Sequence, residues 1–236
     1  MARKSTADQN AQGDVVLVRL AAVPVPPGLK AFVAAFKKQH AALTAASRAA
    51  DVARTSRDAA LSAVGAADDA LDAAVGVLAD KIVGAGIGSR QKPFKAFSAY
   101  SPSVLIGLAY AVEAKEVLAL SAKVKKAAKG NADVTKAAAT CEKLSAGVTS
   151  ALGKLSTPQL AYSKALAARD ALLPGWTKSL DQLKKNAAAV WFDDPATYKA
   201  VFAPPEKVQA PVHARARKAA APAPAAAAPA APAKTP

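Results

Sequence analysis

Side chains that commonly build active sites are scarce in this sequence. It contains one cysteine and two histidines among 236 residues, and only 5% of its residues are aromatic. A single cysteine excludes an internal disulfide and is typical of a reducing compartment. Zinc sites need three or four Cys, His, Asp or Glu ligands, which Cys141, His40 and His213 do not supply. We therefore expect no enzyme activity, no metal site and no cofactor, with Cys141 and His40 packed in a helical core.

Long uncharged apolar runs and nucleotide-binding motifs are also absent. The two most apolar stretches, residues 59–79 and 104–122, are each interrupted by three charged residues, so neither predicts a transmembrane helix. The N-terminus is too polar for a signal peptide. The segment 84–90 (GAGIGSR) fits neither the dinucleotide nor the P-loop pattern, and it is interpreted as a helix terminator. We expect a cytoplasmic protein, with membrane binding disfavoured by the mixed charges of its helices.

Alanine and basic residues are what the sequence has in excess. Hydrophobic residues make up 52% of the chain, and most of them are alanine, which forms helices easily but buries little surface. The net charge is +15. Such a charge either keeps an alanine-rich protein in solution or attracts a polyanion such as nucleic acid.

Residues 28–84 carry the most regular hydrophobic pattern. One heptad position runs through Leu29, Phe36, Leu43, Ala50, Arg57, Val64, Leu71 and Leu78. The position four residues later runs through Val33, His40, Ser47, Arg54, Leu61, Asp68, Val75 and Ile82. This spacing is typical of a coiled-coil seam, and it predicts one continuous helix of about 85 Å at 1.5 Å per residue.

Three further helices and two tails complete the predicted fold. Ser101-Pro102 predicts a helix start and Gly130-Asn131 its end, and two more helices are expected over 134–155 and 158–190, the last kinked at Pro174-Gly175. A short helix follows Asp194, and residues 14–20 read as an extended segment. We predict an all-α, elongated antiparallel bundle of about four helices with coiled-coil-like packing. Its parts are a flexible segment 1–27, a bundle 28–203 and a disordered basic tail 204–236.

The segment 90–100 mixes cations with aromatic rings and contains no acid. Its residues of interest are Arg90, Lys92, Phe94, Lys95, Phe97 and Tyr100. This mixture can bind phosphates while its rings stack on bases or on a protein surface. The alternative is that the rings pack under the end of the bundle while the cations stay in water. The tail residues Arg215, Arg217 and Lys218 form a second candidate contact with a polyanion or partner.

Charged residues at predicted core positions form the other unusual group. They are Arg54, Arg57, Asp68, Glu113 and Arg169. Isolated buried charges are costly, so these groups must pair or reach water. One hypothesis is a buried polar layer in which Glu113 bridges to Arg57 or Arg169. The other is that a bundle packed mainly through small alanine side chains leaves these positions half exposed.

Two functions remain compatible with these features. The first is a non-catalytic scaffold protein that binds a protein partner, or a second copy of itself, through its helix faces and tails. The alternative is a nucleic-acid-associated protein that uses the 90–100 loop and the tail. The Pro/Ala/Lys composition of residues 215–236 resembles the tails of linker-histone-type proteins, which implies nucleic acid as the partner in this alternative.

Overall fold

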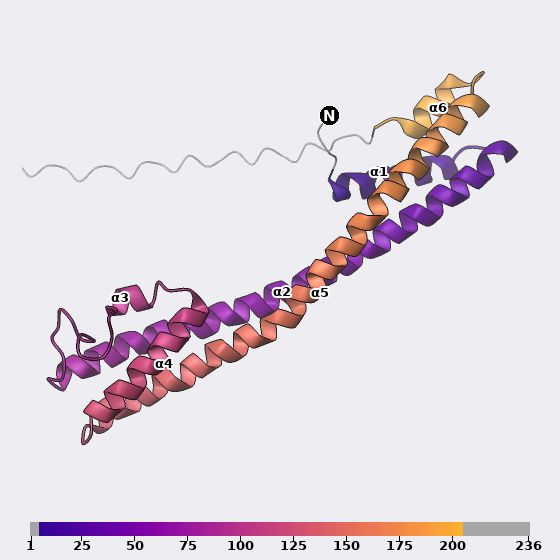
Figure 1. The fold of residues 1–236 in the computed structure, drawn as a ribbon. Helices are drawn as coiled ribbons and strands as arrows, with labels where there is room; N and C mark the ends of the chain where they lie inside the picture. Colours follow the sequence, from indigo (N-terminus) through magenta and orange to yellow (C-terminus); the bar gives the residue numbers. More distant parts are fainter. Residues whose placement is uncertain (1–4, 205–236) are drawn as a thin grey trace, which may run out of the picture. The chain divides into compact units, whose positions relative to one another are not determined.

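The computed structural model describes residues 5–204, and this part of the chain is all-α, as predicted. It contains six helices rather than the expected four (Figure 1). They are α1 (Thr6–Ala21), α2 (Pro27–Gly84), α3 (Pro102–Leu105), α4 (Tyr110–Ala127), α5 (Ala132–Val190) and α6 (Pro195–Phe202).

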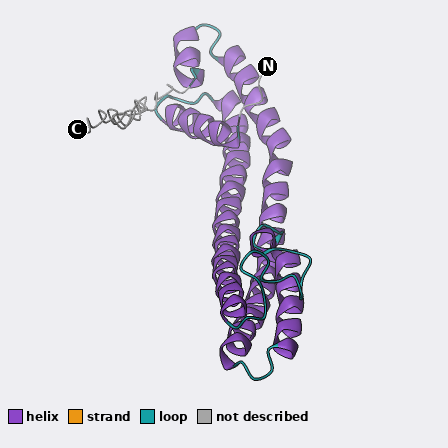
Figure 2. Ribbon diagram, turned by 90° about the vertical axis from the view of Figure 1, so that its left-hand side faces the viewer, coloured by secondary structure: helices purple, strands orange, loops and turns teal. Residues whose placement is uncertain are grey.

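Two long helices, α2 and α5, run side by side in opposite directions (Figures 1 and 2). Near one end, a Cβ added at Gly28 of α2 would lie 3.9 Å from Val190 of α5. Near the other end, Lys81 Nζ lies 2.9 Å from an Asp133 carboxylate oxygen. The predicted continuity of the helix over residues 28–84 is confirmed, because α2 spans 58 residues without interruption.

The predicted division between the third and fourth helices is wrong, because α5 continues for 59 residues through Pro158 and Pro174. A proline inside a helix removes one hydrogen bond and frees the carbonyl four residues earlier. Those carbonyls belong to Lys154 and Asp170, both exposed, so water can satisfy them. Continuing the helix also keeps one face of α5 along α2, and this contact offsets the hydrogen bond that each proline removes.

The predicted single helix over residues 102–129 is interrupted. Its start is confirmed, because the Ser101 hydroxyl accepts a hydrogen bond from the Val104 N–H and Pro102 occupies the first turn. However, α3 ends after four residues, and α4 begins only after Ala109, whose backbone is extended. The interruption lets Leu105 enter the core while α4 turns to pack on α5 and α2.

The predicted extended segment over residues 14–20 is also wrong. Ser5 and Asp8 form a capping box, in which each side chain accepts a hydrogen bond from the other's backbone N–H, and α1 follows. Its valines favour strands by propensity, but Val16 and Leu20 are buried among α2, α5 and α6. Tertiary packing therefore overrides a weak local preference.

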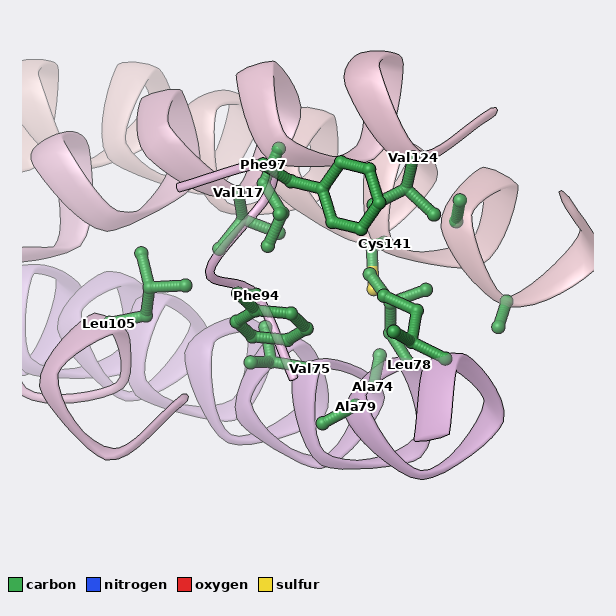
Figure 3. Packing of buried hydrophobic residues seen from close by; sticks show 14 of the residues in the cluster. Ala74, Val75, Leu78, Ala79, Phe94, Phe97, Leu105, Val117, Val124 and Cys141 are labelled. Atoms are coloured by element: carbon green, nitrogen blue, oxygen red, sulfur yellow. The ribbon is translucent and has the colours of Figure 1, made fainter. Parts of the chain in front are cut away.

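Two hydrophobic cores lie at opposite ends of the α2–α5 pair. The loop-end core contains residues of the C-terminal part of α2, the segment 85–109 that includes α3, α4 and the first part of α5 (Figure 3). The termini-end core contains residues of α1, the start of α2, the end of α5, and α6. Since each buried Leu or Phe contributes about 1.5–3 kcal/mol, these two cores carry most of the stability.

Between the two cores, α2 and α5 pair mainly with each other, and α1 reaches α5 only near Asp170 and Pro174, where Gln9 lies beside them. We call residues 51–63 of α2 and 149–175 of α5 the central stretch. No residue of the central stretch is buried, and its seam consists of half-buried alanine, leucine, tyrosine and arginine side chains. The pair is therefore thinly packed at its middle.

Candidate functional site

The 90–100 segment divides into buried rings and exposed cations. Phe94 and Phe97 lie in the loop-end core, where they pack among side chains of α2 and α4 (Figure 3). Tyr100 is half-buried against the same core. The hypothesis that the phenylalanines stack on a ligand is therefore wrong, because both rings are needed to close this end of the fold.

The cations of the same segment, Arg90, Lys92 and Lys95, all face solvent. The Lys92 N–H donates to Ser89 Oγ at 3.2 Å, which tightens the turn. A Cβ at Gly88 would overlap the Pro93 carbonyl, so only glycine allows the loop to fold this closely. The loop therefore holds three positive charges on a well-anchored support. The tail residues Arg215, Arg217 and Lys218 lie outside the described residues.

The predicted bridge from Glu113 to Arg57 or Arg169 is wrong. The Nε of each arginine donates to the adjacent aspartate, Asp58 at 2.8 Å and Asp170 at 2.9 Å.

The seam arginines remain partly in water. Arg57 also lies over the Tyr162 ring, 4.5 Å from its centroid, and Arg54 pairs with Asp51 at 3.2 Å on the exposed surface. With their side chains 27% and 24% exposed, Arg57 and Arg169 reach water and need no distant partner. The alternative that all the seam charges remain half exposed thus agrees with the structure for the arginines, whereas Glu113 is fully buried.

Glu113 instead joins two aspartates of α2. Asp68 and Asp72 lie one turn apart on the same face of α2, and Glu113 reaches them from the first turn of α4. One carboxylate oxygen from each residue lies within 4.8 Å of the other two. The glutamate is fully buried, at 0% exposure, and the aspartates are half-buried. We call these three residues the carboxylate cluster.

Burial and mutual repulsion change the acidity of the carboxylate cluster. Burial is the main cause that raises the pKa of Glu113 to about 8, with further contributions from a hydrogen bond and the charge of Asp72 and from the charge of Asp68. The pKa of Asp68 is also raised, first by burial and then by the charges of Asp72 and Asp69. Both Glu113 oxygens, and one oxygen of each aspartate, are buried and receive no hydrogen bond from a group outside the cluster. The cluster is thus poised to take up a positive charge.

His40 is the packed, hydrogen-bonded histidine that the sequence predicted. It is 4% exposed; its Nε2 lies 2.9 Å from an Asp14 carboxylate oxygen, and Trp176 Nε1–H donates to its Nδ1 at 3.2 Å. The indole donor fixes the neutral tautomer with the proton on Nε2, which then donates to Asp14. Both ring nitrogens are thus used in joining α1, α2 and α5.

Cys141 is buried in the loop-end core, as expected. Burial raises the pKa of its thiol to about 11. The thiolate, which is the reactive form, is therefore scarce at neutral pH, and the residue acts as a small hydrophobic side chain.

Sequence reasoning missed two participants in these clusters. Asp72 stands four residues after Asp68, and this spacing on a predicted helix was a usable signal for a shared face. Asp14 gave no signal, because its segment reads as extended and its contact with His40 exists only when α1 folds back on α2.

Comparisons with known proteins give no information about function, so the functional argument rests on the fold and on these clusters. No protein-family model matches the chain, and no curated protein or solved structure shows significant similarity to it. Among residues 5–204, no helix has the length and apolar character needed to cross a membrane. The described part defines an all-α protein built on a long pair of antiparallel helices.

Proposed function

We propose that the protein is a non-catalytic interaction protein whose docking surface is the central stretch. One observation carries this proposal: between the end cores, no residue is buried over 51–63 of α2 and none over 149–175 of α5. At both ends, additional helices complete a core, whereas the central seam is open. A further helix packed along this seam would bury the apolar edges that α2 and α5 leave in water.

The occupant that fits the central stretch best is a second copy of the chain. Both helices carry an Arg–Asp pair at the seam, Arg57–Asp58 on α2 and Arg169–Asp170 on α5. A surface with both charges is self-complementary in a twofold dimer, because the arginine of one copy can meet the aspartate of the other. The heptad spacing of α2 suits coiled-coil-like packing against such a partner.

Leu61 and Leu160 provide the test of this dimer. Leu61 is 47% exposed on α2 and Leu160 is 57% exposed on α5, both within the central stretch. We expect sedimentation equilibrium to give a dimer for the wild-type protein, and Leu61→Glu with Leu160→Glu to weaken it about tenfold or more, because each loses an apolar contact and introduces a charge.

Leu118→Glu is the matched control, because Leu118 is 48% exposed on α4, away from the central stretch. It should leave the dimer unchanged. A wild-type protein that stays monomeric up to about 100 µM would contradict dimerisation through this surface.

Binding of a polyanion at the 90–100 loop is the second candidate function. The observation in its favour is that Arg90, Lys92 and Lys95 are exposed, and no ion pair in the described part of the chain neutralises them. Their anchoring by buried phenylalanines holds the charges together, and the net charge of +15 favours the approach of an anion.

Salt dependence measures this second candidate directly. Replacing Arg90, Lys92 and Lys95 with glutamine should weaken duplex DNA binding and reduce the slope of log K against log salt by about 2–3, since each phosphate contact contributes about 0.9. A triple glutamine variant at Lys164, Lys178 and Lys185, exposed residues of α5, is the control. Equal slopes for the two variants would assign any binding to net charge alone.

A further inference from the structure

The geometry of the carboxylate cluster matches the coordination shell of a small cation. Asp68 and Asp72 offer oxygens from one face of α2, and Glu113 offers oxygens from α4. Oxygen ligands lie about 2.0–2.6 Å from Mg²⁺ or Ca²⁺, so two ligands on opposite sides of one ion are about 4–5 Å apart. The three oxygens of the cluster lie within 4.8 Å of one another, so one ion can reach all three.

The burial of Glu113 is a second, separate sign that something is bound there. The side chain is 0% exposed, its oxygens lie close to those of the two aspartates, and neither oxygen receives a hydrogen bond from a group outside the cluster. Among residues 5–204, no lysine, arginine or histidine forms an ion pair with any of the three carboxylates. A buried carboxylate without a counter-charge is very costly, so the cluster has to take up either a proton or a cation.

We propose that Asp68, Asp72 and Glu113 bind one hard divalent cation, Mg²⁺, Ca²⁺ or Mn²⁺. Ligands that are all oxygen select this class over zinc or copper, which favour nitrogen and sulfur. Glu113 forms the floor of the site, and the half-buried aspartates leave a side open to solvent. The cation enters from that side and keeps water as its remaining ligands.

The bound cation acts structurally by joining two helices. Glu113 lies in the first turn of α4, directly after the irregular segment 106–109 that separates α3 from α4. Coordination to Asp68 and Asp72 fixes this turn on α2. The cation therefore stabilises the loop-end core and leaves the central stretch free, so this inference does not depend on the proposed docking function.

Calorimetric titration of the metal-stripped full chain tests the site. At about pH 8, MgCl₂, CaCl₂ and MnCl₂ are titrated separately up to about 10 mM. We expect at least one cation to bind with one-to-one stoichiometry and to raise the unfolding temperature. Glu113→Gln and Asp72→Asn should each weaken binding about tenfold or more, since even partners outside the first coordination shell contribute about 10–100-fold.

Asp69→Asn is the matched control, because it removes an exposed carboxylate adjacent to Asp68 but outside the cluster. This variant should bind the cation as the wild type does. Glu113→Gln keeps the shape of the side chain, so its circular dichroism spectrum should match the wild type and separate lost binding from lost folding.

Two results would overturn the proposal. One is the absence of binding heat and of any thermal shift with all three cations, which would leave a proton as the charge that the cluster takes up. The other is equal binding by wild type, Glu113→Gln and Asp72→Asn, which would place the cation elsewhere on the chain.

Discussion

In buffer with a chelator, the protein should lose stability as the pH rises from about 5 to about 8, and Glu113→Gln should remove most of this loss. The pKa of Glu113 is raised from 4.5 to about 8 in the folded protein. Between these values the folded state binds more protons than the unfolded state, so the free energy of unfolding falls as pH rises. The stabilising contribution is fully present below about pH 4.5 and is lost as pH passes through about 8.

The expected size of this effect is a few kcal/mol, at about 1.4 kcal/mol for each pH unit. Urea unfolding at about pH 5, 7 and 9 measures it, with Glu113→Gln more stable than wild type at the highest pH. Asp133 and Asp194 have pKa values lowered by Lys81 and Thr197, respectively, so they change stability only in the acid range, below their usual pKa.

Glu116→Gln is the control for the pH experiment, since Glu116 is a half-buried glutamate of α4 outside the carboxylate cluster. Its pH profile should follow that of the wild type. A Glu113→Gln profile that also parallels the wild type would show that Glu113 is ionised throughout the range.

Gly13→Ala should destabilise the protein by about 2–3 kcal/mol, although the same change inside a helix ordinarily stabilises. A Cβ at Gly13 would overlap the imidazole of His40. The ring cannot move away freely, because Asp14 and Trp176 hold its two nitrogens and Phe36 stacks on it with centroids 5.9 Å apart. Either α1 separates from α2 or these hydrogen bonds break.

Gly147→Ala is the matched control for Gly13→Ala. Gly147 is an exposed residue inside α5, and a Cβ there would meet nothing within 4 Å. This change should stabilise by about 0.5–1 kcal/mol, because alanine loses less conformational freedom on folding. Denaturant unfolding compares the two variants, and near-ultraviolet circular dichroism reports the surroundings of Trp176. Equal stabilisation by both would mean that α1 does not pack on His40.

Helix starts and ends were predicted best, because capping and backbone preferences act within a few residues. The Ser101-Pro102 start, the short helix after Asp194 and the glycines that end α2 all follow from capping and backbone preferences. The Ser5-x-x-Asp8 capping box is an equally local signal for α1, but the valines within residues 14–20 predict an extended segment instead. Propensity is weak compared with the burial of Val16 and Leu20.

The candidate sites depended on contacts between distant residues, which sequence spacing does not fix. The sequence correctly predicts a core-facing position for Glu113, but it predicts arginines of opposite charge as the partners. The arginines found adjacent aspartates instead, and the glutamate came to lie against two carboxylates. Opposite charge favours a pair only where the helices bring the two groups together.

The helical character of the described chain and the continuity of α2 follow from local sequence, because alanine propensity and a sustained heptad spacing act along the chain. Tertiary structure alone decided that α5 continues through two prolines, that α1 folds onto His40 and that three carboxylates meet. These outcomes depend on which helix faces pack against each other. The packing is determined by the total apolar surface that the two end cores bury, which involves residues far apart in the sequence.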